Sequence, residues 1–150
     1  MSNYREKLWP APWLYIATAL VMPASLLVLL PISIEAGVIT AVVLYLGCVI
    51  LLITGSPVVE VTPGFLFAGK ARLPIGLIGD VEAFEGDEAR MERGQRLDAR
   101  AWLLIRGWVR PVVKVQVTDE ADPAPYWLVS TRNPDGVVAA IAAAREAATH

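Results

Sequence analysis

The stretch WLYIATALVMPASLLVLLPISIEAGVITAVVLYLGCVILLITGSP, from Trp13 to Pro57, decides the architecture of this chain. Between Leu8 and Ser56 the only formally charged side chain is that of Glu35. Hydrophobic residues make up 55% of the 150 residues, which is high for a soluble domain. Nearly a third of the chain is therefore unsuited to water, and the composition favours a membrane protein.

Two transmembrane helices are expected within this stretch. A hydrocarbon layer about 30 Å thick is crossed by about 20 apolar residues in a helix. Residues 13–32 supply one such run, and residues 36–54 supply a second. Pro31 and Glu35 lie near the short connection and indicate a tight turn, so the two helices should form an antiparallel hairpin. Gly37 and Ala41 form a small-x-x-x-small pair that favours close helix approach.

Pro23 lies in the middle of the first run and predicts a kinked helix, which a membrane tolerates. Two alternatives to a membrane hairpin are disfavoured. A cleaved signal peptide has a shorter apolar run, followed by a small-residue cleavage site that is missing here. A buried hairpin of a soluble protein would have to be covered on all sides by residues 57–150, which are too few for the task.

The orientation follows from the basic residues near the helix ends. Arg5 and Lys7 precede the first helix, whereas the inter-helix turn has no basic residue. The positive-inside rule therefore places the N-terminus in the cytoplasm, and two crossings return the C-terminal part to the same side. We expect a multi-pass protein of the cell membrane whose two termini are both cytoplasmic, with residues 1–56 as the N-terminal segment and anchor.

Residues 57–150 change to an alternating pattern that predicts a cytosolic β-rich domain. In VVKVQVT, residues 112–118, the valines alternate with polar residues, as in a half-buried antiparallel strand. Six or seven such short strands precede one amphipathic helix at about residues 134–148, for which Asn133 is the expected N-cap. The charged segment 85–100 reads as a solvated loop with at most one helical turn.

The expected fold class is thus a membrane α-helical hairpin plus a small α+β domain. Its sheet is an antiparallel sheet or an incomplete barrel, closed by the C-terminal helix. By element order alone, this domain resembles pleckstrin-homology-like domains.

A resemblance to a known family extends over nearly the whole chain. It is based on YREKLWPAPW at residues 4–13, IRGWVRP at 105–111, and above all TDEADPAPYWLVSTRNPDGVVAAI at 118–141. With its two hydrophobic runs, the chain is similar to an actinobacterial family of small two-helix membrane proteins, catalogued as a domain of unknown function. The resemblance implies an integral membrane protein and brings no catalytic residues.

The residue inventory excludes most familiar chemistry. Cys48 is the only cysteine and His150 the only histidine. A disulfide within the chain, a cysteine-based metal site and histidine-based catalytic dyads or triads are therefore excluded. No glycine-rich phosphate loop is present, and a net charge of -2 gives no nucleic-acid footprint. Asp119, Glu120 and Asp122 lack the spacing of a calcium loop and read as an acidic turn. We expect no enzymatic activity, no cofactor and no metal.

The candidate contact site is basic and aromatic. It consists of Lys70, Arg72, Arg106, Trp108, Arg110 and Lys114. If the sheet brings them together beside the membrane, they form a positive patch for anionic lipid headgroups. The alternative is ordinary strand-end charges paired with Glu60, Asp80 and Glu82. Arg132 is expected to pair with Asp135 or cap nearby carbonyls, and Trp102 and Trp127 to lie in the core.

The sequence therefore predicts a non-enzymatic, membrane-tethered binding or scaffolding module. Its expected partners are the lipid bilayer, anionic headgroups, or an unidentified membrane or cytosolic protein. The alternative function is an accessory subunit or lipid-handling membrane enzyme whose site forms only with other chains. Transport is disfavoured because the helices carry no ionisable path.

Overall fold

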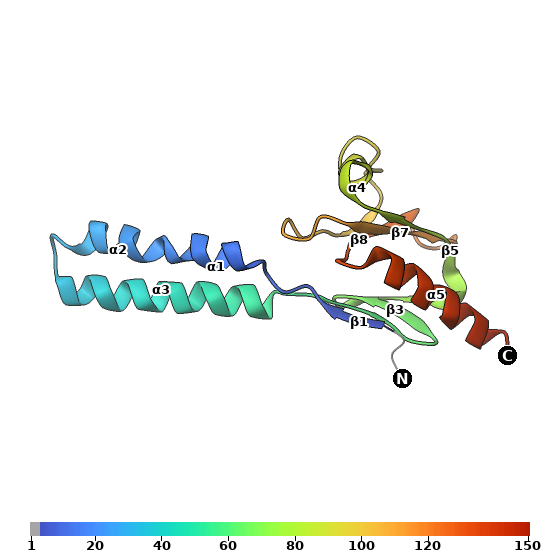
Figure 1. The fold of residues 1–150 in the computed structure, drawn as a ribbon, viewed down its shortest axis with the longest axis horizontal. Coiled ribbons are helices and arrows are strands. Elements are labelled where there is room, and N and C mark those ends of the chain that lie inside the picture. Colours follow the sequence, from blue (N-terminus) through green and yellow to red (C-terminus); the bar gives the residue numbers. More distant parts are fainter. Residues whose placement is uncertain (1–3) are drawn as a thin grey trace. The chain divides into compact units, whose positions relative to one another are not determined.

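The computed structural model describes residues 4–150, which form two compact units (Figure 1). The helical unit is Trp9–Ser56. The β unit combines the N-terminal residues up to Leu8 with Pro57–His150. In its described part the chain therefore leaves the β unit after Leu8 for the helices and re-enters it at Pro57.

The helical unit confirms two apolar helical segments. The first is interrupted, with α1 at Pro12–Ala19 and α2 at Val21–Leu29, and the second is the continuous α3 at Ile34–Thr54. Pro23 explains the interruption, because it has no N–H to donate to the carbonyl one turn earlier. Pro12–Leu29 and Ile34–Thr54 are each long and apolar enough to cross a membrane.

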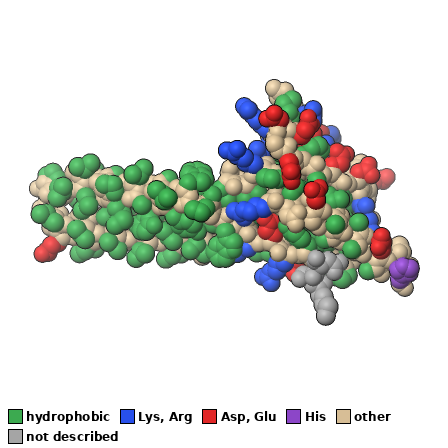
Figure 2. All heavy atoms as spheres, in the orientation of Figure 1, with side chains coloured by type: hydrophobic (Ala, Val, Ile, Leu, Met, Phe, Trp, Pro, Cys, Tyr) green, Lys and Arg blue, Asp and Glu red, His purple; other side chains and the backbone are tan. Residues whose placement is uncertain are grey.

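The α2–α3 contact uses small residues, as predicted. Gly37 and Ala41 are the buried residues of α3, and a Cβ on Gly37 would lie 3.2 Å from Leu26 Cδ2. Most other apolar side chains of the unit point outward, and Ile16, Leu27 and Ile32 are each more than 70% exposed. Figure 2 shows hydrophobic side chains over the visible face of this unit. Such a surface requires lipid or protein to cover it.

Two four-stranded sheets make up most of the β unit. Sheet A has the order β1-β2-β3-β4, with β1 at Tyr4–Lys7, β2 at Val58–Val61, β3 at Phe65–Ala68 and β4 at Ala71–Pro74. The 3₁₀ turn η1, Ile75–Leu77, leads into sheet B. Sheet B has the order β5-β7-β8-β6, with β5 at Ile78–Phe84, β6 at Trp102–Leu104, β7 at Val112–Val117 and β8 at Tyr126–Ser130.

Residues 57–150 contain seven strands, β2 to β8, within the predicted six or seven, but the prediction of one antiparallel sheet was wrong in two respects. In the described residues the strands form two sheets, and β1, which precedes the helical unit in the sequence, adds an eighth strand by pairing antiparallel with β2. In addition, β6 pairs parallel with β8, in the register Trp102–Trp127. The four residues of β1 carry three charges and no alternating apolar pattern, so only their partner reveals them as a strand.

The C-terminal helix α5, Pro134–Ala148, packs against strands of both sheets (Figure 1). Its N-terminus is capped as predicted, since Asn133 Oδ1 accepts the Gly136 N–H at 3.0 Å. Val137, Ile141 and Ala144 are at most 1% exposed and join the sheet valines in one continuous core. The expected closure of the sheet by this helix is confirmed.

The charged segment 85–100 is more ordered than predicted. It contains a helix, α4, at Gly86–Arg93, and Ala89 is fully buried in a second, smaller core. Glu92 is only 4% exposed, and its carboxylate meets Lys114 Nζ at 3.5 Å and Arg96 Nη1 at 3.4 Å. The sequence did not predict this helix because most of its residues are charged and its buried residues are Ala89 and the charged Glu92, which form no apolar stripe.

Candidate functional site

Glu6 of β1 lies at the meeting point of two distant segments. Its carboxylate accepts a hydrogen bond from Thr131 Oγ1 at 2.5 Å and another from the Arg132 backbone N–H at 3.0 Å. The Tyr4 hydroxyl donates to the same carboxylate at 2.8 Å. The Glu6 side chain is 14% exposed. A half-buried carboxylate with three donors therefore ties the N-terminal strand to the β8–α5 connection.

This environment changes the acidity of Tyr4. Burial, together with the negative Glu6 carboxylate, raises the pKa of the Tyr4 phenol to about 12, although the Thr131 hydroxyl lowers it. The phenol therefore stays protonated and remains a donor to Glu6 throughout the physiological pH range.

The IRGWVRP segment forms a loop that is fastened at three points. The Arg106 backbone N–H donates to Ser130 Oγ at 3.0 Å, and the Thr131 N–H donates to the Pro111 carbonyl at 3.1 Å. Trp108 Nε1 donates to the Leu8 carbonyl at 3.3 Å. Residues 105–110, here called the basic loop, are thus held beside Leu8. All three segments that carry the family resemblance meet here.

Lys70 lies at the same end of the β unit as the basic loop. The preceding Gly69 has a positive φ of 61° that suits glycine in this tight turn, and its N–H donates to the Val58 carbonyl at 2.8 Å. A Cβ on Gly69 would lie 3.7 Å from both Leu104 Cδ1 and Pro57 Cβ. We call this end of the β unit the exit edge. It comprises Leu8, Pro57, the Gly69–Lys70 turn and the basic loop, and the chain passes to the helices through it.

Two of the six predicted contact residues lie elsewhere. Arg72 is on the outer face of sheet A, with its guanidinium carbon 5.5 Å from the centroid of the Phe65 ring. Lys114 lies on the α4 side of sheet B, 4.5 Å from the Tyr126 ring and paired with Glu92. Lys70, Arg106, Trp108 and Arg110 belong to the exit edge. The alternating direction of strand side chains separates the other two from it.

Arg132 and the two strand tryptophans have structural positions. The Arg132 guanidinium lies 4.0 Å from Glu6 Oε1, a contact between residues 126 positions apart that the sequence did not predict. Trp102 and Trp127 stack with ring centroids 4.4 Å apart. Both pack in the main core, as predicted, and Trp127 is 5% exposed.

In the acidic turn between β7 and β8, aspartate side chains accept hydrogen bonds from the backbone of the same turn. Asp119 Oδ1 accepts the Ala121 N–H, and Asp122 Oδ1 accepts the Ala124 N–H, each at 2.9 Å. These are the local bonds that aspartate makes in tight turns. Among residues 4–150, no three His, Cys, Asp or Glu side chains are grouped so as to hold a metal ion.

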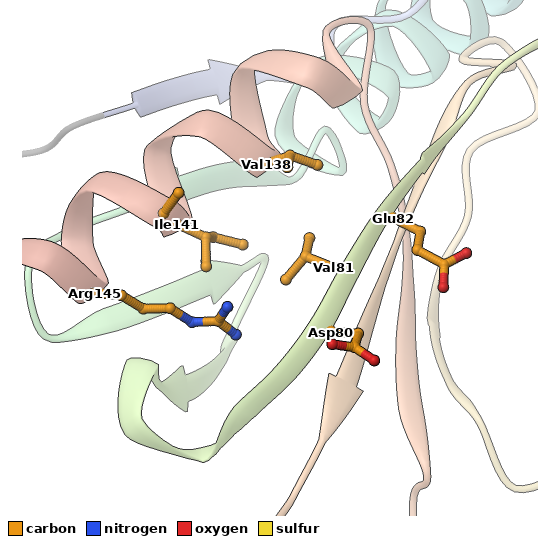
Figure 3. Close-up of a pocket in the computed structure, with 7 residues that line it drawn as sticks. Asp80, Val81, Glu82, Val138, Ile141 and Arg145 are labelled. Atoms are coloured by element: carbon orange, nitrogen blue, oxygen red, sulfur yellow. The ribbon is translucent and has the colours of Figure 1, made fainter.

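Sequence reasoning missed a pocket of about 380 Å³ between β5 and α5 (Figure 3). Its lining residues are Asp80, Val81, Glu82, Val138, Ile141, Ala142 and Arg145. The Arg145 guanidinium donates to the Ile78 carbonyl at 2.7 Å and also to the Gly79 carbonyl. Gly76 and Gly79 precede this part of β5, and glycines at such positions are typical of a bulge rather than of a pocket.

Comparison with known proteins identifies the family. Residues 3–141 match the family described as "Protein of unknown function (DUF3093)", and the chain belongs to it. No curated protein and no solved structure gives a significant match.

Proposed function

We propose that this protein is a non-enzymatic, membrane-tethered binding module. Its helical hairpin spans the cell membrane, and its β unit holds a partner protein at the inner face, with both termini in the cytoplasm. The exit edge rests against anionic lipid headgroups there. The single observation that carries this proposal is the hydrogen bond from Trp108 to Leu8, the last β-unit residue before the helical unit.

Chain connectivity supports contact between the exit edge and lipid. The connections between the two units are short, because only residues 8–11 separate β1 from α1 and only residues 55–57 separate α3 from β2. If the hairpin spans the bilayer, the exit edge therefore lies within a few residues of the membrane surface. Trp108 suits the interface because its ring is amphipathic. Lys70, Arg106 and Arg110 each contribute about 1 kcal/mol near an anionic leaflet.

The headgroup contact predicts a charge-dependent protection of the basic loop. We expect slower amide exchange at residues 105–110 when the full chain is placed in nanodiscs containing phosphatidylglycerol rather than phosphatidylcholine alone. Arg106→Ala with Arg110→Ala should reduce the equilibrium constant for contact between the basic loop and the headgroups more than tenfold, because two contacts of about 1 kcal/mol each are lost. High salt should have the same effect in the unmodified chain.

Arg72→Ala with Arg90→Ala is the matched control, because it removes two exposed arginines outside the exit edge. This control should retain the protection. Equal exchange at residues 105–110 in the two lipid compositions would rule out headgroup contact at this edge.

Binding of a partner protein is tested separately. A photoreactive residue in place of Trp108 should give a recurrent protein adduct in the native membrane, and the same protein should co-purify in mild detergent. A tightly bound small molecule and no protein adduct would favour the lipid-handling alternative instead.

A further inference from the structure

The β5 strand is one edge of sheet B. In the described part of the chain it is hydrogen-bonded to β7 on one side only. Its regular pairing covers Val81 to Phe84, opposite Val115 to Val112, and the register shifts between Ile78 and Val81. The backbone groups that point away from β7 are therefore available to another strand.

The pocket runs along this free edge. Asp80, Val81 and Glu82 line it from three successive positions of β5. The α5 residues that line it, Val138, Ile141, Ala142 and Arg145, are spaced by three and four positions and share one face of the helix. Figure 3 shows the strand and the helix as the two walls. The pocket is thus a groove with space for an extended segment beside β5.

The two faces of the β5 edge differ in chemistry. Val81 points toward α5, where Val138 and the 1% exposed Ile141 complete an apolar wall (Figure 3). Asp80 and Glu82 point to the opposite side and are exposed. Among the ion pairs within residues 4–150, none involves either carboxylate. A strand added here would place alternate side chains against an apolar wall and an acidic rim.

Arg145 closes one end of the groove. It occupies the carbonyls of Ile78 and Gly79, so strand addition begins beyond them, at Val81. A Cβ on Gly79 would lie 2.5 Å from Gln116 Oε1, so a larger residue would displace the Gln116 side chain, which accepts the Asp80 N–H at 3.1 Å. The contacts of Arg145 and Gln116 hold the irregular start of β5 in place. The regular edge that remains for a partner strand runs from Val81 to Phe84.

We propose that the β5–α5 groove binds an extended segment of a partner protein by strand addition. The segment alternates apolar residues, which contact Val81, Val138 and Ile141, with basic residues, which contact Asp80 and Glu82. This inference rests on the proposed function as a binding module, and it names the docking edge and the partner class.

The test uses the full chain in a non-ionic detergent and a fluorescent peptide of alternating valine and lysine. We expect saturable binding by anisotropy. Asp80→Lys with Glu82→Lys should weaken it at least tenfold, because two attractive contacts become repulsive. The matched control, Glu60→Lys with Asp87→Lys, changes the net charge equally outside the groove and should bind like the unmodified chain. Thermal melts establish that all variants are folded.

A second peptide separates strand addition from simple charge attraction. N-methylation of alternate residues keeps every charge but removes the backbone donors on one edge, so we expect the methylated peptide to lose binding. Equal binding of both peptides, or equal binding to the groove and control variants, would overturn the proposal. If the peptide does not bind the groove but a protein adduct still forms at Trp108, the function as a binding module stands and only this docking edge is wrong. Failure of both experiments refutes both proposals.

Discussion

Glu6→Ala is expected to lower the free energy of unfolding of the β unit by about 3 kcal/mol. The substitution removes a half-buried carboxylate and with it one acceptor each of the Thr131 hydroxyl, the Arg132 N–H and the Tyr4 hydroxyl. The Tyr4 and Thr131 oxygens lie 3.3 Å apart and can still bond to each other. Unsatisfied buried groups of this kind cost about 1–3 kcal/mol each, and Thr131 is fully buried. Loss of these hydrogen bonds should also weaken the attachment of β1 to the β8–α5 connection.

Urea unfolding in detergent measures this effect, with near-ultraviolet circular dichroism of the Trp102–Trp127 pair as the signal. Glu6→Gln keeps an acceptor oxygen and should lower the free energy of unfolding by about half as much as Glu6→Ala. The ion pair between Glu6 and the partly exposed Arg132 guanidinium, 4.0 Å apart, should account for about 0.5 kcal/mol or less of the loss. The account fails if Glu6→Ala unfolds within error of the unmodified chain.

The pH dependence of stability gives an independent reading of the same contact. Folding raises the pKa of Tyr4 from 10.0 to about 12, so the folded state favours the protonated phenol. This contribution to stability is fully present below pH 10 and is lost as the pH rises toward 12. The loss should be absent in Tyr4→Phe.

Val43→Arg with Leu46→Arg is expected to expel α3 from the membrane. Both side chains lie near the middle of α3 and are more than half exposed on the helical unit, so they face lipid in the spanning arrangement. An arginine at a helix centre adds about 3 kcal/mol to the free energy of membrane insertion. The cost of two arginines therefore exceeds the favourable insertion free energy of the other α3 residues. With only the first helical segment inserted, residues 57–150 should move to the opposite side of the membrane, away from β1.

A reporter fused after His150 measures this inversion in intact cells. The matched control, Val43→Leu with Leu46→Val, exchanges apolar residues at the same positions and should keep the reporter on its original side. An unchanged side in the arginine variant would mean that α3 does not cross the bilayer.

The apolar helices and the C-terminal helix were predictable because their signals are local. A charge-free run from Leu8 to Glu35, a proline at position 23 and an Asn-Pro cap at Asn133 each determine structure within a few residues. The same applies to β7, where the alternation of valines marks the core face.

The candidate site was only partly predictable because its contacts are distant in sequence. Glu6 and Thr131 are separated by 125 positions, and Trp108 and Leu8 by 100. No periodicity reports such pairs, so β1, the parallel β6–β8 pairing and the β5–α5 groove required the tertiary structure. The grouping of the basic residues stays a prediction, and strand geometry places Arg72 and Lys114 outside the exit edge.

Cysteine labelling of the hairpin tests the central claim most directly. In a Cys48→Ser background, Ile32→Cys marks the α2–α3 connection and Thr149→Cys marks the C-terminal end, and a membrane-impermeant maleimide is added to intact cells. We predict that position 32 is labelled from outside, whereas position 149 reacts only after lysis. Labelling of position 149 in intact cells, or protection of position 32, would contradict a hairpin that holds the β unit at the inner face.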